Sequence, residues 1–295
     1  MEALINDTAT ADLDILLIQE PPVSFFDSFV QHRQWQAHVP TYQGPERKRA
    51  ILYINKRIAT STYQQTRCDS PDVTAIQVQT PHGPISIYSV YVPPIGGTGH
   101  AAEQEMQATL HAIQSTHSSH NTDPNGDMIL CGDLNRQDPL WGGDHIQPYR
   151  VGNAASLLLF MQDRGLQSHL ARGTPTCWST TRQGSRTALD LILSNLSSQL
   201  VICSLYHDSY GSDHRAIFAE WSISLQHKRE RPARRMYERT DWTKVGTSLR
   251  AALRTPQTIK TTDELDEAVA SLVDTTTALV AQHTCLLYTS DAADE

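Results

Sequence analysis

Four apolar runs in this chain each have an acidic or amide residue within them or close to one end. The runs are 14–18 before Glu20, 128–131 before Asp133 and Asn135, 188–193 around Asp190, and 216–223 after Asp213 and His214. A hydrophobic stretch of about four to six residues is typical of a buried strand, and a polar residue at its end lies at the rim of the sheet. We therefore predict that these distant segments supply one shared polar site.

The residue types at these positions are carboxylates, one amide and one imidazole. Carboxylate and amide oxygens suit a hard cation such as Mg²⁺, and a metal ion together with a nearby base activates a water molecule. The pattern therefore predicts Mg²⁺-assisted hydrolysis of a phosphodiester.

Each motif is weak when it is taken alone. Glu20 by itself is an ordinary solvated acid at a strand end, and 132–135 (Gly-Asp-Leu-Asn) is equally well a turn after a strand. The His of 212–214 (Ser-Asp-His) could be satisfied within its own turn. Asp190 is different, because it is surrounded by apolar residues, where a carboxylate is costly unless it is paired. We predict that His214 is its partner.

Composition limits the remaining choices. A chain of 295 residues, 39% of them hydrophobic, can form one large domain of about 220 residues and an extension. The net charge of −8 argues against nucleic-acid binding through overall charge, although a locally basic groove is compatible with it. The five cysteines have neither C-x-x-C nor zinc-type spacing, so we expect them to be reduced and the protein to be intracellular. No signal peptide and no membrane-length apolar run are recognisable.

The predicted strands and helices do not alternate strictly. Strands are expected at 14–18, 50–54, 73–79, 85–92, 128–131, 188–193, 201–206 and 216–223, and helices at 2–12, 101–116 and 153–163, the last ended by Gly165. This order favours the α+β class, with two sheets packed face to face and covered by helices.

The composition and the predicted secondary structure change near residue 226. Six basic residues lie between 228 and 239, and two helical segments follow, the second opening with the capping-box pair Thr261 and Glu264. We predict a domain over 1–225 and a basic, helical linker over 226–284. The basic run could contact DNA, direct nuclear import or simply be solvated. Residues 285–295 resemble translated read-through of a sequencing adapter, and we do not expect them to belong to the native fold.

The order of the motifs resembles the endonuclease/exonuclease/phosphatase superfamily. It runs from Gln19-Glu20 through Tyr91-Val92-Pro93-Pro94, 132–135 and Asp190 to 212–214. The resemblance implies a four-layer α/β/β/α sandwich of two mixed sheets. Within the superfamily, 138–143, 173–176 with Trp178, and 211–217 resemble the endonuclease domain of non-LTR retrotransposons. In those elements a reverse transcriptase domain follows in the same polypeptide, and 226–284 resembles the connector.

The same resemblance implies roles for the motif residues. Glu20, Asp213 and Asp133 would hold Mg²⁺, with Mn²⁺ as the alternative cation. Asp133 would also orient and deprotonate the attacking water, and Asn135 would hold that water or the phosphate.

The remaining roles concern the phosphate and the DNA. Asp190 would fix His214, which would donate to the non-bridging oxygens, and Tyr91 would contact the same phosphate. Arg136, next to the site Asn, is a candidate for a DNA-backbone contact. Trp141 could stack on DNA, although a Trp after Pro-Leu is more often packed inside.

The function predicted from these residues is that of a nuclear DNA endonuclease that nicks its target to prime reverse transcription. The alternatives are a superfamily phosphatase or lipid phosphodiesterase, and an inactive retroelement remnant. Inositol phosphatases of this group tend to carry an aromatic residue where this chain has Arg136, and this difference argues against the phosphatase alternative. The main support for the remnant alternative is that the superfamily normally begins with a strand, carrying an Asn, that precedes the helix at which Met1 lies. Truncation at both ends is therefore expected, and no Tyr-x-Asp-Asp polymerase motif occurs.

Overall fold

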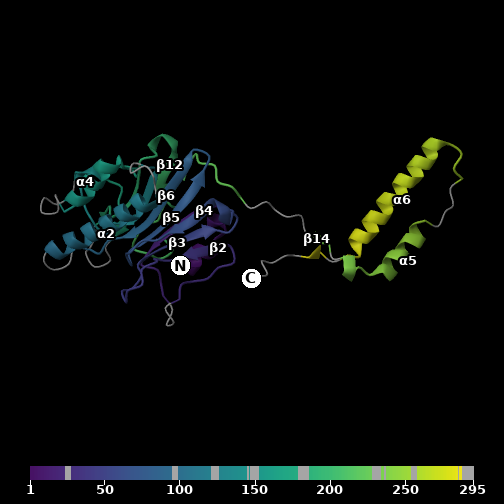
Figure 1. The fold of residues 1–295 in the computed structure, drawn as a ribbon, viewed down its shortest axis with the longest axis horizontal. Helices are drawn as coiled ribbons and strands as arrows, with labels where there is room; N and C mark the ends of the chain where they lie inside the picture. Colours follow the sequence, from purple (N-terminus) through teal and green to yellow (C-terminus); the bar gives the residue numbers. More distant parts are fainter. Residues whose placement is uncertain are drawn as a thin grey trace. The chain divides into compact units, whose positions relative to one another are not determined.

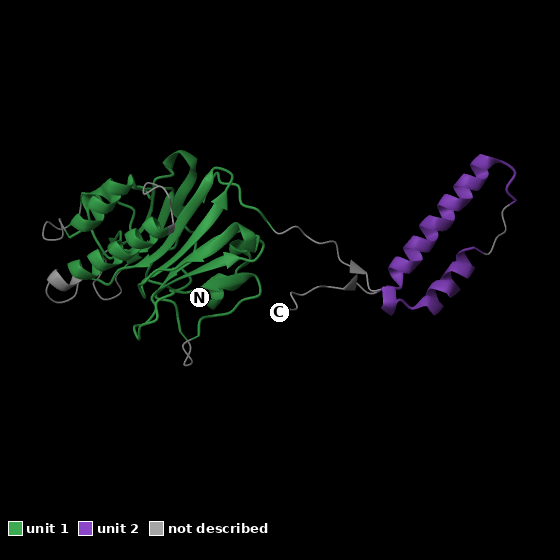
Figure 2. Ribbon diagram, viewed as in Figure 1, with its two compact units in different colours: residues 1–228 green, residues 229–295 purple. Residues whose placement is uncertain are grey.

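The computed structural model describes residues 1–23, 28–94, 99–120, 126–144, 146, 153–178, 186–227, 234–235, 237–253, 258–284 and 286–287. These residues belong to two units, Met1–Lys228 and Arg229–Glu295 (Figure 2). Residue 226 still belongs to the first unit, where its carbonyl accepts a hydrogen bond from the Ala59 amide (2.9 Å). The first unit therefore extends slightly beyond the predicted boundary at residue 225.

A six-stranded mixed sheet forms the centre of the first unit. Its strands, in spatial order, are β4 (Tyr63–Thr66), β5 (Val73–Thr80), β6 (Gly83–Tyr91), β7 (Met128–Asp133), β11 (Asp190–Ser194) and β8 (Gln167–Ser168). Only β6 and β7 are parallel, and α2 (Gly99–His120) is the crossover that a parallel pair requires (Figure 1).

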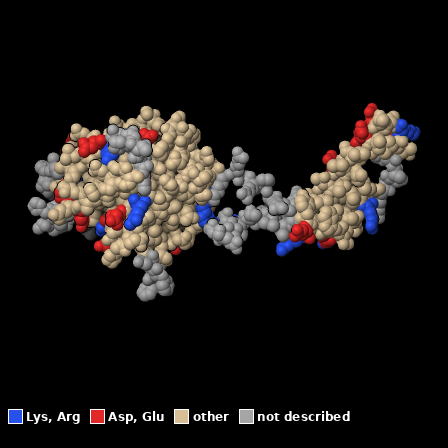
Figure 3. Space-filling view, in the orientation of Figure 1, with Lys and Arg blue, Asp and Glu red and all other residues tan. Residues whose placement is uncertain are grey.

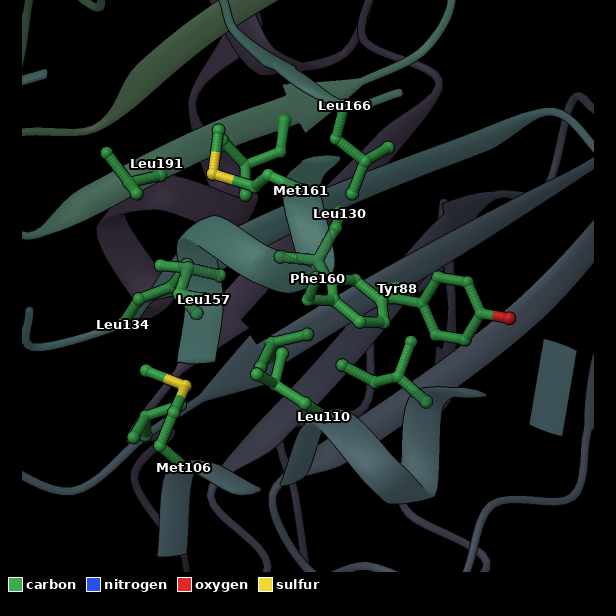
Figure 4. Close-up of a cluster of buried hydrophobic side chains, with 14 of the residues drawn as sticks. Tyr88, Met106, Leu110, Leu130, Leu134, Leu157, Phe160, Met161, Leu166 and Leu191 are labelled. Carbon is green, nitrogen blue, oxygen red and sulfur yellow. The ribbon is translucent and has the colours of Figure 1, made fainter. Parts of the chain in front are cut away.

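Helices α2 and α4 (Ala155–Arg164) cover one face of this sheet. Met106 and Leu110 from α2 and Leu157 and Phe160 from α4 lie in one buried cluster with Leu130 of β7 (Figure 4). Apolar residues recur on the inner side of both helices, which explains why they pack there. Helix α4 ends where the sequence predicts, because Gly165 takes the left-handed conformation (φ 63°) of a helix C-cap.

The opposite face of the six-stranded sheet packs against a second layer of strands. This layer contains β1 (Ile15–Gln19), β3 (Ala50–Asn55) and β2 (Trp35–His38) in the order β1-β3-β2, together with the pair β12 (Leu200–Leu205) and β13 (Ile217–Trp221). Ile54, Ile76, Ile87 and Ile192 belong to the buried cluster between the two layers. Helix α1 (Glu2–Asn6) covers the outer side, where Ile5 packs with Tyr53. The predicted α+β class with α/β/β/α layering is confirmed.

The second layer is divided. Within the described residues, β1 pairs with β3 alone and β13 pairs with β12 alone, so the two pieces share no ladder.

Several short elements were not predicted, since their sequences carry little apolar periodicity. They include β2, β4, the short helix α3 (Pro139–Gly142), the two-residue strands β8, β9 (Cys177–Trp178) and β10 (Arg186–Thr187), and 3₁₀ turns at Thr8–Thr10, Thr60–Thr62 and Ser197–Gln199. Strand β4, with the sequence YQQT, shows why, because its edge position is set by pairing with β5 rather than by its own pattern.

The second unit contains α5 (Trp242–Ala252) and α6 (Thr262–Gln282), with a 3₁₀ turn at Tyr237–Arg239 and two-residue strands β14 (Arg234–Arg235) and β15 (Leu286–Leu287). The predicted capping box is present, since the Thr261 side chain accepts from the Glu264 amide (3.2 Å) and Glu264 accepts from the Thr261 amide (3.2 Å). Part of the apolar stripe of α6, Leu265, Val269 and Leu272, is exposed. No helix among the described residues has the length and apolar character needed to cross a membrane.

Gly132 is the position in β7 at which a side chain is least tolerable. A Cβ atom there would lie 1.7 Å from the carbonyl oxygen of Val90 on the neighbouring strand β6. We expect Gly132→Ala to lower the free energy of unfolding by about 3 kcal/mol, because the backbone of β6 would have to move. Urea denaturation of the first unit measures this loss. Gly211→Ala is the comparison: that Cβ meets no atom within 4 Å, so only its φ of 81° opposes alanine, at about 1 kcal/mol. Equal losses would contradict a steric cause.

Candidate active site

Three predicted site residues lie side by side because of the strand topology. Tyr91 ends β6 and Asp133 ends β7, and the two are partners in the parallel register. Asp190 begins β11 and is the antiparallel partner of Asp133. Parallel strands end at one edge of a sheet, and an antiparallel neighbour begins at that edge. The structure therefore brings together residues that are up to 99 positions apart, from Tyr91 to Asp190.

Asn135 holds the Asp133 carboxylate in place. Its side-chain amide donates to Oδ2 of Asp133 (2.8 Å) and to the carbonyl of Val92 (3.0 Å), and its backbone amide donates to Oδ1 of Asp133 (3.1 Å). Asn135 adopts a φ of 48°, a region that Asn enters more easily than most residues. Both Asp133 oxygens are thus oriented by one residue.

His214 and Asp190 form the predicted pair. Nδ1 of His214 lies 2.8 Å from Oδ2 and 3.0 Å from Oδ1 of Asp190. This hydrogen bond is the main cause that raises the pKa of His214 to about 9, against the opposing effect of burial. At neutral pH His214 is therefore a cation whose second ring nitrogen is available as a donor.

Burial is the main cause that raises the pKa of Asp133, to about 7, and the negative charge of Asp190 adds to it. The positive charge of His214 acts in the opposite direction. A carboxylate with this pKa accepts a proton from water far more readily than an ordinary aspartate does, which is a property of a general base. Asp213 lies close to His214, with ligand atoms within 4.8 Å of each other, and its negative charge helps to raise the pKa of His214.

Glu20 reaches the same edge from the second layer. It follows β1 with a φ of 49°, and its amide donates to the Arg49 carbonyl (2.7 Å). Its charge and a hydrogen bond from Tyr91 help to raise the pKa of the Tyr91 hydroxyl, for which burial is the first cause. Gln19 donates to Ser89 of β6 (3.1 Å), so the two layers are tied together beside Glu20.

Arg49 and Asp72 belong to this edge, although the sequence did not single them out. The Arg49 guanidinium makes two hydrogen bonds to Asp72 (both 2.6 Å) and lies 4.9 Å from the centre of the Tyr91 ring. Both residues precede strands, whereas the sequence pattern concerns polar residues that follow strands. Only the antiparallel topology shows that these starts and ends share an edge.

The donor set decides which residues could hold a cation. Two clusters of metal-ligand type occur among the described residues, Asp133 with Asp190 and His214, and Cys177 with Asp213 and His214. Asp190 and His214 are occupied by each other, and burial raises the pKa of the Cys177 thiol to about 11, so a hard cation gains little from them. The oxygen donors that fit Mg²⁺ are the predicted ones, Asp133, Asp213 and Glu20. Glu20 belongs to neither cluster.

Arg136 and Trp141 are placed differently from the predicted DNA-contacting surface. Arg136 is 1% exposed, and its guanidinium donates to the carbonyls of Pro93 and Asn135 (both 3.1 Å). Trp141 is 2% exposed and its indole N–H donates to the Arg136 carbonyl (3.1 Å). A side chain without exposed surface cannot contact a phosphate or stack on a base. The predicted DNA contacts of Arg136 and Trp141 are therefore wrong. Both residues hold the loop after Asp133, and Trp141 is packed inside, which is the alternative given for it above.

Comparison with known proteins agrees with this geometry. A family model described as endonuclease-reverse transcriptase matches residues 85–218. Search of curated protein sequences gives no match.

Three solved structures share the fold at low sequence identity. The endonuclease domain of TRAS1, a telomere-specific non-LTR retrotransposon, has a TM-score of 0.55 and 19% identity, over 72% of this chain and 88% of that one. The AP endonuclease LMAP from Leishmania major has a TM-score of 0.55 and 16% identity, over 73% and 82%. The Xenopus laevis APE2 catalytic domain has a TM-score of 0.51 and 14% identity, over 76% and 88%.

The layered fold and the match of the family model to residues 85–218 make the chain similar to the endonuclease/exonuclease/phosphatase superfamily. This similarity supports an activity on phosphodiester bonds. The endonuclease domain of a non-LTR retrotransposon is among the solved structures with this fold.

Proposed function

We propose that this protein is a Mg²⁺-dependent DNA endonuclease that nicks target DNA to prime reverse transcription. The observation that carries the proposal is the meeting of Glu20, Tyr91, Asp133, Asp190 and His214 at one edge of the packed sheets. These residues combine a base, a cation and oxygen donors, which are the groups that phosphodiester hydrolysis requires.

The charge of each side chain indicates its role in the reaction. Asp133, oriented by Asn135, takes the proton of the attacking water. His214, charged and fixed by Asp190, donates to the non-bridging oxygens as negative charge accumulates on them, and the Tyr91 hydroxyl donates to the same phosphate. Mg²⁺ or Mn²⁺, held by Asp133, Asp213 and Glu20, would neutralise further charge on the phosphate.

DNA is the proposed substrate because the family model is described as endonuclease-reverse transcriptase and a retrotransposon endonuclease domain is among the structures with this fold. A reverse transcriptase domain in the same polypeptide would use the nick, and the site of action would be the nucleus. Basic and acidic side chains are interspersed on the face of the first unit in Figure 3. Binding through a few positioned groups therefore fits better than binding through a broad basic surface.

Nicking of a supercoiled plasmid tests the proposal. We expect open circles in the presence of Mg²⁺ or Mn²⁺ and none after the metal is removed by a chelator. Release of phosphate from inositol phosphates, measured beside it, tests the phosphatase alternative. Phosphate release without nicking would overturn the endonuclease assignment.

One observation favours the inactive alternative, namely that β1 and β13 are not paired with each other. A melting curve during a Mg²⁺ titration separates the two. An intact site binds the cation in the folded state only, so the melting temperature rises with Mg²⁺ concentration. Asp133→Asn should abolish most of this rise, while Asp144→Asn, an exposed carboxylate, should retain it. A parent protein insensitive to Mg²⁺ that nicks no DNA would establish the inactive remnant.

A further inference from the structure

Two arginines lie over the ring of Trp178, which follows Cys177, the bridge partner of His214. The Cζ atom of Arg215 is 4.8 Å from the centre of the indole ring, and that of Arg186 is 5.0 Å away. Both distances are typical of cation–π contacts, and the ring is 41% exposed. The site roles described above use none of these three residues.

The two arginines come from neighbours on opposite sides of β9. Arg186 in β10 is the antiparallel partner of Trp178. On the other side, the Arg215 amide donates to the Thr176 carbonyl (2.6 Å), and Trp178 donates to the Asp213 carbonyl (2.9 Å). The backbone therefore fixes where both side chains start, and the ring restricts where they can go.

Neither guanidinium has an acidic partner in the part of the chain that the structure describes. Among the residues that the structure describes, no carboxylate forms an ion pair with Arg186 or Arg215, whereas Arg49, Arg57 and Arg172 each have one. The Nε of Arg215 is buried without a hydrogen-bond partner in the described structure. Two positive guanidinium groups over one ring favour binding of an anion that both can contact. The paired N–H groups of an arginine match the spacing of phosphate oxygens.

The arginines lie on segments that adjoin the catalytic His214. Arg215 follows His214 in sequence, and consecutive Cα atoms are about 3.8 Å apart. Phosphates of one DNA strand follow each other at about 3.4 Å along the helix axis. Arg215 is adjacent to His214 in the chain, and Cys177, next to Trp178, is the bridge partner of His214. The nearest further anion for the arginines on a bound strand is therefore a phosphate next to the scissile one.

We propose that Arg186 and Arg215, ordered by Trp178, bind the phosphate adjacent to the scissile one. This arginine clamp rests on the proposed function and deepens it, because it selects a polynucleotide over a substrate with a single phosphodiester. Arg186 and Arg215 contact the substrate. Trp178 is a positioning residue, which reduces the rotamer freedom that the arginines lose on binding.

Binding to a labelled DNA duplex, followed by fluorescence anisotropy in a chelator, tests the clamp without cleavage. We expect Arg186→Gln and Arg215→Gln each to raise Kd about tenfold and to lower the salt dependence of binding by about one phosphate contact. Trp178→Leu should weaken binding although both arginines remain, and Trp178→Phe should restore most of it. Lys56→Gln, the same charge change after β3 at the end away from Arg49, is the control and should bind like the parent.

Cleavage of DNA is then compared with hydrolysis of bis(4-nitrophenyl) phosphate, which has no neighbouring phosphate. The clamp predicts that the arginine variants lose at least about ten times more activity on DNA than on the small diester. Equal losses on both substrates, or DNA binding equal to that of the parent, would overturn the clamp. A parent that cleaves neither substrate contradicts the proposed function instead, and the anisotropy measurement still decides whether the arginines bind DNA.

Discussion

Replacement of His214 by alanine is expected to slow plasmid nicking about a hundred- to a thousand-fold, the usual effect of losing one preorganised donor to a developing negative charge. The reason lies in its pairing with Asp190, which keeps the ring charged and fixed at neutral pH. Single-turnover nicking in saturating Mg²⁺ measures the chemical step. Binding of DNA should change much less than the rate, because the donor acts mainly in the transition state.

The control for this experiment is His82→Ala. His82 is exposed in the turn between β5 and β6, and it should leave the nicking rate and the melting temperature unchanged. A His214→Ala protein that melts like the parent and nicks as fast would remove His214 from the chemistry. A large drop in melting temperature would call for His214→Gln, which keeps a polar side chain of similar reach.

The nicking rate is expected to have a maximum between pH values of about 7 and about 9, the raised pKa values of Asp133 and His214. Asp133 must lose its proton to act as a base, so the rate falls as the pH drops below its pKa. His214 must keep its proton to act as a donor, so the rate falls as the pH rises above about 9. A bound cation stabilises the carboxylate form of Asp133 and would move the acid limb to lower pH.

Asp190→Asn tests the origin of the basic limb. The hydrogen bond from His214 to Asp190 is the first cause of the raised pKa, so its charge-neutral replacement should move this limb from about 9 toward the ordinary 6.5. The acid limb should also move down, because the Asp190 charge raises the pKa of Asp133. The pH dependence of single-turnover nicking at constant ionic strength measures both limbs. A basic limb that stays in place would show that a group other than His214 controls it.

The sequence predicts the local parts of this protein well, wherever a single residue has one physical requirement. Asp190 among leucines needed a partner, and His214 is that partner. Gly165 ended a helix, as a residue able to adopt a positive φ does, and Thr261 with Glu264 formed a capping box. Arg136 shows the limit of such reasoning. The position of Arg136 next to Asn135 in the sequence fits a phosphate contact. Whether its side chain is exposed, however, depends on the residues that pack against it in the fold.

The amino-acid sequence by itself determined the class of fold, the order of the site motifs and the pairing of Asp190 with His214, because these follow from periodicity and from the cost of an unpaired buried charge. Only the tertiary structure decided that Arg49 and Asp72 border the site, that Arg136 and Trp141 are internal, and that Trp178 lies between Arg186 and Arg215. Strand pairing sets these relations across long sequence separations, where no local pattern records them.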